Sequence, residues 1–356
     1  MKHRMGFIGF GGMGGGYHYE VAKDRSDVCN DLAPVAVYDI RESRRAVARE
    51  RGLIAYDKLE DILSNDEIDV IVVACTNNFH CEMTCRALEA GKHVVCEKPA
   101  AMSPEEFGIM LDTAKRTGKK LFVHQNRRFD RDFMIVKKAV DEGRLGKVST
   151  IESTFCGGMM TGWRSFKDHA GGILYDWGVH LIDQIVYLTG EPVKSVYADL
   201  KSEKTPEVDD RSVIEIKFES GLKARVTVCG SFLTPQPRFS VYGEKGVLWV
   251  DKIYAESGTL RFAKNAEWKA GMTDAYNENG PYKREELHLN EDIVSVQYPD
   301  DGTAFRQDWA SYLYKNIFDT IDGNAQMIVK HDEVMTVLRI IEAAFKSSDT
   351  GNIVEF

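Results

Sequence analysis

A glycine-rich segment near the N-terminus has the residue types and spacing that bind phosphate groups. It fits the pattern G-x-G-x-x-G and follows a short apolar run. In this pattern the first glycine permits a tight turn, the second lets a pyrophosphate approach the backbone, and the third lets a helix pack on a strand. Unpaired N–H groups at the start of that helix attract the phosphates. The alternative is an ordinary turn, but the context predicts a dinucleotide-binding loop made of Gly9, Gly11, Gly12, Met13 and Gly14.

Asp39 extends this prediction to the adenosine end of the nucleotide. It lies 25 residues after Gly14, at the end of the apolar run Val35–Tyr38. An acidic residue there accepts hydrogen bonds from ribose hydroxyls. Its charge would repel a ribose 2′-phosphate, which favours NAD over NADP. Arg41 and Arg44 could instead bind such a phosphate, so NADP stays the second candidate.

Lys98 is the first candidate for chemistry on a substrate. It lies two residues after the apolar run His93–Cys96 and directly before Pro99. In an open parallel sheet the ligand crevice lies at the carboxyl ends of the strands. Lys98 would therefore lie beside the cofactor, where a desolvated lysine can donate a hydrogen bond to a hydroxyl and exchange a proton with it. The alternative is a solvated surface lysine.

A second group of polar residues lies on a later helical segment. Asp176, His180 and Asp183 are spaced four and three residues apart, which places them on one face of a helix. A histidine can take the proton of a hydroxyl near neutral pH, and a carboxylate one turn away can orient it. The alternatives are a structurally paired helix face or a metal site. One helix face offers only part of a coordination shell, so we expect no metal.

The elements around these residues alternate in the first third of the chain. Apolar runs that suit buried strands alternate with segments that suit helices, for example Asp69–Cys75 followed by Glu82–Ala90. Strands that alternate with helices indicate a parallel sheet with right-handed crossovers. We therefore expect an α/β protein in which residues 1–124 form a doubly wound domain.

The pattern changes after residue 124. Strand-like stretches follow one another with few helices between them, which favours a largely antiparallel sheet in a second α/β domain over residues 125–356. Residues 263–301 are polar and rich in turns, so we expect an irregular segment there. Two helices should follow, at Ala304–Asp322 and Asp332–Ser347. The expected strands are Val148–Cys156, Val193–Leu200, Arg211–Glu219, Leu222–Gly230, Phe239–Gly243 and Gly246–Asp251.

The composition of the 356 residues fits a two-domain globular protein. The 46 Lys and Arg against 55 Asp and Glu, a net charge of −9, argue against nucleic acid and membrane surfaces as partners. No apolar stretch approaches the roughly 20 residues that cross a bilayer, and the N-terminus does not resemble a signal peptide. The seven cysteines form no Cys-x-x-Cys pair. We therefore expect a cytoplasmic protein with reduced thiols.

Four of these segments together resemble the Gfo/Idh/MocA oxidoreductase family, named for glucose–fructose oxidoreductase and inositol dehydrogenase. They are the glycine loop, Glu97–Pro99, Asn126–Phe129 and Gly171–Asp183. The resemblance implies a Rossmann domain followed by an α/β domain whose open, mostly antiparallel sheet forms the interface of a homodimer or homotetramer. It also implies NAD(P)-dependent oxidation or reduction of a carbohydrate or cyclitol, with the catalytic residues Lys98, Asp176 and His180.

The resemblance implies contacts to both ligands. Cofactor contacts would come from Thr76, Asn78, His80, Glu97, Lys98 and Asn126. Substrate contacts would come from Lys98, Arg127, Trp163, Arg164, Asp176 and His180. One departure is that the family's Thr-Pro-Asn is here Thr76–Asn78 without the proline. Tyr17 and His18 could line the same crevice.

These inferences combine into the oxidation of a secondary alcohol on a polyol ring. We expect His180 to remove the hydroxyl proton, Lys98 to steady the oxygen, and Asp176 to fix the substrate or the imidazole. One rival is an enzyme with tightly bound, recycled NAD, either a sugar–sugar oxidoreductase or an NAD-assisted glycoside-cleaving enzyme. The other is a non-catalytic NAD(P)-sensing regulator, against which the three intact catalytic candidates speak. The second domain lacks an evident Arg/Lys cluster, which disfavours a phosphorylated substrate.

Overall fold

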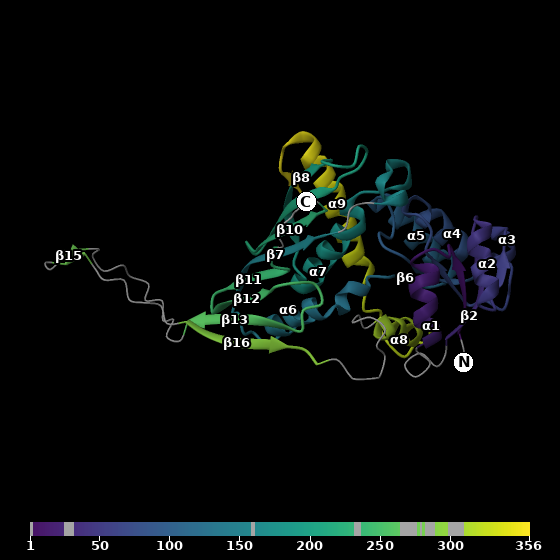
Figure 1. Cartoon of the computed structure of the whole chain (residues 1–356), viewed down its shortest axis with the longest axis horizontal. Coiled ribbons are helices and arrows are strands. Elements are labelled where there is room, and N and C mark those ends of the chain that lie inside the picture. Colours follow the sequence, from purple (N-terminus) through teal and green to yellow (C-terminus); the bar gives the residue numbers. More distant parts are fainter. Residues whose placement is uncertain are drawn as a thin grey trace.

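Two β-sheets with helices packed on them organise the chain (Figure 1). The computed structural model describes residues 3–24, 32–157, 161–230, 236–263, 276–277, 280–281, 289–297 and 310–356. Cys29, one of the thiols that we expect to be reduced, lies outside these residues, and no disulfide joins the other six cysteines, which all lie within the described ranges. Across these ranges, no helix is both long and apolar enough to cross a bilayer.

The first sheet is parallel and has the strand order β3-β2-β1-β4-β5-β6. All four residues of β4 are buried, as its continuous apolar sequence predicts. The strand order reverses between β1 and β4, which places a ligand crevice at the carboxyl ends of these strands. The expected doubly wound fold is therefore confirmed. Its strands are β1 (His3–Ile8), β2 (Leu32–Tyr38), β3 (Ile54–Tyr56), β4 (Val70–Val73), β5 (His93–Cys96) and β6 (Leu121–Val123).

Five helices connect these strands: α1 (Tyr19–Asp24), α2 (Glu42–Glu50), α3 (Leu59–Leu63), α4 (His80–Glu89) and α5 (Pro104–Thr117). Figure 1 shows α2 and α3 beyond one edge of the parallel sheet, far from the second sheet.

The second sheet is mostly antiparallel and has the order β16-β13-β12-β11-β7-β10-β9-β8-β17. Only the pair β7–β10 is parallel among its described pairs. Alternate residues of each strand face a core covered by α6 (Arg131–Asp141), α7 (Val179–Thr189) and α9 (His331–Thr350). In β9, for example, Ile214 and Ile216 are buried while Glu215 and Lys217 are exposed.

Six strands of this sheet, β7 to β12, agree with the expected bounds within one residue, whereas β13, β16 and β17 were not expected. The strands are β7 (Val148–Cys156), β8 (Val193–Lys201), β9 (Arg211–Phe218), β10 (Lys223–Cys229), β11 (Phe239–Gly243), β12 (Gly246–Val250), β13 (Ser257–Ala263), β16 (Leu289–Ser295) and β17 (Val354–Glu355), with a separate small pair β14 (Tyr276–Asn277) and β15 (Gly280–Pro281).

One expectation about this region is wrong for the part that the structure describes; residues 264–275, 278–279, 282–288 and 298–301 lie outside the described residues. The polar, turn-rich sequence of residues 263–301 predicts an irregular segment, but β16 lies within it and pairs with β13 along its whole length. The signal is weak because β16 is an edge strand whose only buried residue is Val294, and its polar residues Glu291 and Asp292 are exposed. An edge strand with one solvated face needs little apolar sequence, so its period-two pattern is hard to detect.

Helix α8 (Ala310–Ile321) returns the chain to the first sheet. Its residues Leu313, Tyr314 and Ile317 are buried in the same apolar core as the strands β1–β6. The division into residues 1–124 and 125–356 separates the two sheets, and we keep it as a proposal. The contact of α8 shows that the C-terminal segment also stabilises the first domain.

A buried arginine links segments on either side of this division. Arg128 is 1% exposed and donates two hydrogen bonds to Asp183, from Nε to Oδ2 at 2.7 Å and from Nη2 to Oδ1 at 2.6 Å. Its Nη1 donates to Glu333 at 2.6 Å. The pairs thereby join the chain after β6 to α7 and α9. Asp183 is thus bound to Arg128, not to the other polar residues of its helix.

Replacing Arg128 by Met should lower the free energy of unfolding by about 3–5 kcal/mol, because it leaves a buried Asp183 carboxylate without its partner. The matched control is Arg225→Met, which breaks an ion pair with Glu215 whose side chains are about half exposed. That change should lower the free energy of unfolding by less than about 1 kcal/mol. Urea unfolding followed by circular dichroism gives both values, and equal effects would contradict the assignment.

Candidate active site

The glycine loop between β1 and α1 is held by close backbone packing. A Cβ on Gly9, whose φ is +91°, would lie 2.6 Å from the carbonyl oxygen of Ala74, and one on Gly14 would lie 2.0 Å from the carbonyl oxygen of Gly9. Around Gly12, in contrast, the space for a Cβ is open. The loop therefore needs glycine for its own packing at two positions and leaves its backbone accessible at a third.

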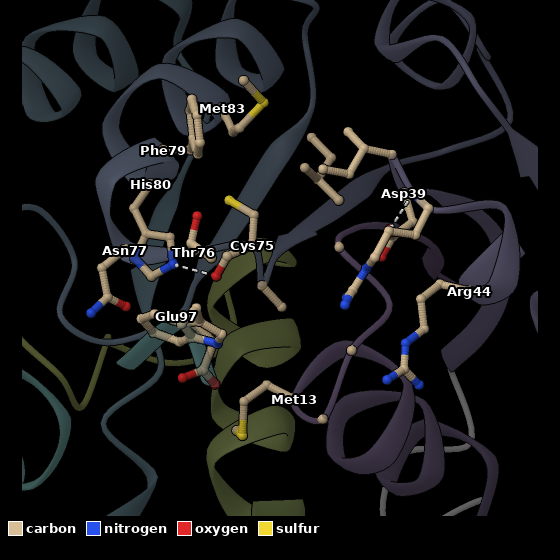
Figure 2. A pocket seen from close by; sticks show the side chains of 18 of the residues that line it. Met13, Asp39, Arg44, Cys75, Thr76, Asn77, Phe79, His80, Met83 and Glu97 are labelled. Carbon is tan, nitrogen blue, oxygen red and sulfur yellow. Dashed lines mark hydrogen bonds and ion pairs between the residues drawn. The ribbon is translucent and has the colours of Figure 1, made fainter. Parts of the chain in front are cut away.

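Asp39 ends β2 with its carboxylate fixed by the backbone. Oδ2 accepts a hydrogen bond from the N–H of Phe10 at 2.8 Å, and Oδ1 accepts one from the N–H of Arg41 at 2.9 Å. Each oxygen keeps a lone pair for a further donor. Figure 2 shows Asp39 and Arg44 on one side of a cavity, with His80 and Glu97 on the opposite side.

This cavity has a volume of about 650 Å³, within the usual range for a bound small molecule. It lies at the carboxyl ends of β1, β2, β4 and β5, and residues from the segment before α7 close one end. The structure brings these predicted site residues to its wall: Gly9, Gly11, Gly12, Met13, Asp39, Arg41, Thr76, His80, Glu97, Lys98, Trp163, Arg164 and Asp176.

Other lining residues were missed by sequence reasoning. They are mostly apolar and include Tyr38, Ile40, Ala74, Cys75, Asn77, Phe79 and Met83. The sequence offered one signal for several of them. They follow the carboxyl end of β4, and residues that follow a strand of a parallel sheet are candidates to line the crevice. Asn77, and not the predicted Asn78, lines the cavity. Its side chain donates a hydrogen bond to the carbonyl of Ala170 at 2.9 Å.

Several predicted residues do not line the cavity and have other partners. Asn78 accepts a hydrogen bond from the Thr76 hydroxyl at 2.8 Å, and Asn126 donates to the Tyr17 hydroxyl at 3.2 Å. Arg127 bonds Asp130 and Tyr254 and stacks over Trp177 at 4.1 Å. The residues outside the lining are Gly14, Tyr17, His18, Asn78, Asn126, Arg127 and His180.

Lys98 and Asp176 meet at the closed end of the cavity. The Nζ of Lys98 donates to the backbone oxygen of Asp176 at 2.6 Å and to its Oδ1 at 3.0 Å. The same Oδ1 lies 3.0 Å from Nε of Arg164. Burial alone would raise the pKa of Asp176, but the positive charges of Lys98 and Arg164 outweigh it and hold that pKa below its usual value. Asp176 is therefore an ionised carboxylate between two cations.

The position of Asp176 depends on an irregular helical turn. Residues Leu174–Gly178 form a π-helical turn that leads into α7, and the glycine loop leads into α1 through a similar turn at Gly14–His18. Such turns re-aim side chains that a regular helix would place elsewhere, and they are frequent at functional sites.

His180 begins the first turn of α7 and is buried. Burial lowers the pKa of His180 well below its usual value, and the charges of Lys98 and Arg127 lower it further. Its Nδ1 has no hydrogen-bond partner among the residues that the structure places. At neutral pH this imidazole is uncharged and can accept a proton.

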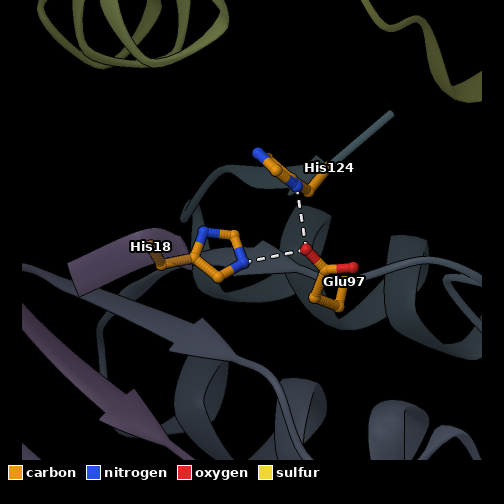
Figure 3. A group of neighbouring side chains, drawn as sticks. All are labelled: His18, Glu97 and His124. Atoms are coloured by element: carbon orange, nitrogen blue, oxygen red, sulfur yellow. Dashed lines mark hydrogen bonds and ion pairs between the residues drawn. The ribbon is translucent and has the colours of Figure 1, made fainter. Parts of the chain in front are cut away.

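The turn Glu97–Pro99 is anchored by histidines. The Nδ1–H of His80 donates to the carbonyl oxygen of Pro99 at 2.7 Å. His18 and His124 both point to one carboxylate oxygen of Glu97, at 2.8 Å each (Figure 3). On its other side, Nδ1 of His18 is hydrogen-bonded to the hydroxyl of Tyr314. The chain segment that carries Lys98 is thereby held by the turn before α1, by the residue that follows β6 and, through His18, by α8.

The cluster of His18, Glu97 and His124 has the residue types of a metal site, with ligand atoms within 4.8 Å of one another. Tetrahedral zinc, with bonds of about 2.0–2.1 Å, holds its ligand atoms about 3.3 Å apart. The two 2.8 Å separations in this cluster are those of hydrogen bonds. The expectation of no metal stays a prediction.

A dinucleotide fits this cavity. The open space at Gly12 leaves backbone N–H groups at a helix start accessible to phosphates. The fixed carboxylate of Asp39 can accept from ribose hydroxyls at one end, and Lys98 lies at the other end. Arg41 and Arg44 line the Asp39 end, where a 2′-phosphate would be bound.

Comparisons with known families agree with this site. Residues 3–125 match the oxidoreductase family with an NAD-binding Rossmann fold. Residues 133–249 match the GFO/IDH/MocA C-terminal domain. The first match covers the parallel sheet and includes the glycine loop, Asp39 and Lys98, and the second extends from α6 into β12 of the other sheet.

Individual relatives cover most of the chain. Scyllo-inositol 2-dehydrogenase (NADP(+)) IolW of Bacillus subtilis is 30% identical over 301 residues, which are 82% of this chain and 80% of the relative. D-glucoside 3-dehydrogenase of Escherichia coli is 30% identical over 352 residues, 92% and 91% of the two chains. A crystal structure of an NAD-binding protein from Listeria innocua superposes with a TM-score of 0.84 and 34% identity, covering 100% of this chain and 97% of the other.

Proposed function

The chain belongs to the Gfo/Idh/MocA family of NAD-binding oxidoreductases, and on that premise we propose that it oxidises a secondary hydroxyl of a sugar, glycoside or cyclitol. The observation that carries the proposal is the meeting of Lys98 and Asp176 at one end of the cavity, 3.0 Å apart. Lys98, which follows a strand of the parallel sheet, and Asp176, from the turn before α7, converge there, and the charge of Lys98 is close enough to lower the pKa of the buried His180. This is the set that a hydride-transfer reaction on an alcohol needs to handle the proton.

The nicotinamide of bound NAD(P) would supply the hydride acceptor. Asp39 would accept hydrogen bonds from the adenosine ribose, which favours NAD. Arg41 and Arg44 could bind the 2′-phosphate of NADP. The relative from Bacillus subtilis is named for NADP(+). The glycine loop from Gly9 to Gly14 would hold the phosphates.

The chain's own residues would divide the proton chemistry among them. His180, whose pKa is lowered by burial, accepts the hydroxyl proton. Lys98 donates a hydrogen bond to the same oxygen and stabilises its developing negative charge. Asp176 orients Lys98 and holds the substrate, with Arg164 fixing its carboxylate. Trp163, which lies against Arg164 at 4.6 Å, offers a ring face on which a sugar ring can stack.

The substrate class is supported by the relatives' names. One is named for scyllo-inositol and another for a D-glucoside, both of which carry secondary hydroxyls on a six-membered ring. The partner is thus proposed to be a small carbohydrate or cyclitol. The homodimer or homotetramer and the cytoplasmic location stay predictions.

Absorbance at 340 nm tests the proposal, with purified protein, NAD or NADP in excess and a panel of inositols, aldoses and glycosides. We expect the absorbance to rise with a ring alcohol. Lys98→Met should still bind the cofactor, but its turnover should be at least about a hundredfold lower. The control is Lys92→Met, which removes a lysine bound to the carbonyl of Asn65 and outside the cavity lining. Near-normal turnover of Lys98→Met would contradict the role of Lys98. No rise with any compound, together with NAD bound to freshly purified protein, would favour the recycled-cofactor enzyme instead.

The pH dependence follows from His180. Its lowered pKa means that it stays uncharged, and able to accept a proton, at neutral and mildly acidic pH. Protonation abolishes the base, so kcat/KM for alcohol oxidation should fall only as the pH drops below about 6.5, the usual histidine pKa. A pH profile between 5 and 9 checks this, and a loss of activity beginning above pH 7 would contradict it.

A further inference from the structure

Asp209 is a buried carboxylate in the loop that leads into β9, outside the cavity. It is 8% exposed and is not among the residues that line the cavity. Its Oδ2 accepts a hydrogen bond from the hydroxyl of Ser212 at 2.6 Å, and Ser212 is fully buried in β9. The second sheet therefore fixes the direction in which this carboxylate points.

The carboxylate points to the start of the turn that carries Asp176. The same Oδ2 accepts a hydrogen bond from the N–H of Leu174 at 2.9 Å. The backbone oxygen of Asp209 accepts another from the N–H of Ile173 at 2.8 Å. N–H groups at the start of a helical turn have no partner within the turn, and the apolar side chain of Ile173 cannot accept from them. Asp209 thus caps this turn from a distant segment of the chain.

Two glycines allow the close approach of these segments. A Cβ on Gly172, whose φ is +111°, would lie 2.2 Å from Oδ1 of Asp209, and one on Gly171 would lie 2.2 Å from the carbonyl oxygen of Arg164. The N–H of Gly172 donates to that Arg164 oxygen at 3.0 Å. The glycine pair therefore packs against Asp209 on one side and against the segment that carries Arg164 on the other.

The position of this turn decides how Asp176 meets its partners. The N–H of Asp176 donates to the carbonyl oxygen of Gly172 at 3.1 Å, so a movement at Gly172 is passed on within one turn. Asp176 lies 3.0 Å from both Lys98 and Arg164. A shift of about 1 Å would take these atoms beyond hydrogen-bond distance.

We propose that Asp209 is a positioning residue that holds Asp176 against Lys98 by capping the turn before α7. The proposal rests on the proposed function for the reaction that Asp176 and Lys98 serve. Asp209 acts through hydrogen bonds to the backbone. Removal of its acceptor oxygens should therefore release the turn and leave the dinucleotide end of the cavity intact.

The first test is the turnover of Asp209→Ala with NAD or NADP and the ring alcohol that the wild-type protein oxidises. We expect kcat/KM to fall about ten- to a hundredfold, because a misplacement of about 1 Å has effects of that size. The Kd for the cofactor should stay within about twofold. Asp209→Asn keeps an oxygen that can accept from Leu174, so it should recover most of the lost kcat/KM. Equal losses in the two variants would overturn the role of the acceptor.

A second background shows whether Asp209 acts through Asp176. In Asp176→Ala only the backbone oxygen at this position is left to contact Lys98, so adding Asp209→Ala should lower kcat/KM by less than about threefold. The full loss in both backgrounds would overturn the proposal. If Asp209→Ala does not fold, Ser212→Ala removes the hydroxyl that directs the carboxylate. Its smaller loss should disappear in the Asp176→Ala background, and a loss that persists there would also overturn the proposal.

Asp210 provides the matched control for a general loss of stability. It is buried in the same segment and accepts hydrogen bonds from the N–H groups of Glu203, Lys204 and Thr205 at 2.6–2.8 Å. None of these residues lines the cavity. Asp210→Ala should lower the urea midpoint of unfolding at least as much as Asp209→Ala, yet leave kcat/KM within about twofold. Equal losses of turnover would show that stability alone is responsible and overturn the proposal.

A crystal structure of Asp209→Ala gives a result that needs no substrate. The Nζ of Lys98 and Oδ1 of Asp176, which are 3.0 Å apart in the wild-type protein, should be separated by more than about 4 Å. An unchanged distance would overturn the proposal even if turnover falls. Wild-type protein that oxidises no ring alcohol would instead overturn the proposed function, and this distance would then decide the role of Asp209.

Discussion

The ion pair between Lys98 and Asp176 is the interaction on which the site depends. Lys98 comes from the carboxyl end of β5 in the parallel sheet, and Asp176 from the turn before α7, which packs on the other sheet. Both side chains are less than one-fifth exposed. A buried charge is stable only with its partner, so this pair fixes how the two halves of the chain meet at the cavity.

The surrounding structure positions that pair without neutralising it. His80 holds the carbonyl of Pro99, and Glu97 is held by two histidines, so the residues on both sides of Lys98 are anchored. These anchors are hydrogen bonds between imidazoles and the oxygens of Pro99 and Glu97. A further contact, from Arg164 to Asp176, keeps the carboxylate ionised. The polar network thus extends from His18, in the turn before α1, to Asp176, in the turn before α7. Hydrogen bonds of this kind hold the side chains of a functional site in position.

Much of the fold could be predicted from the sequence because the signals are local. The continuous apolar runs of the parallel strands, the glycine loop and the strand-end positions of Asp39 and Lys98 each depend on a few neighbouring residues. The edge strand β16 escaped prediction because its polar residues hide its alternation. Arg127, Asn126 and Asp183, in contrast, form hydrogen bonds with residues that are far away in the sequence, such as that of Asp183 with Arg128. The spacing of residues along a helix does not reveal such partners.

A crystal structure with NAD+ bound tests the central claim most directly, namely that one cavity holds the dinucleotide with its nicotinamide at the Lys98–Asp176 pair. The account predicts ribose hydroxyls within about 3 Å of the Asp39 carboxylate, phosphates at Gly11 and Gly12, and the nicotinamide ring beside Glu97 and Lys98. A nicotinamide bound at the Asp39 end, or a dinucleotide bound outside the cavity, would contradict it.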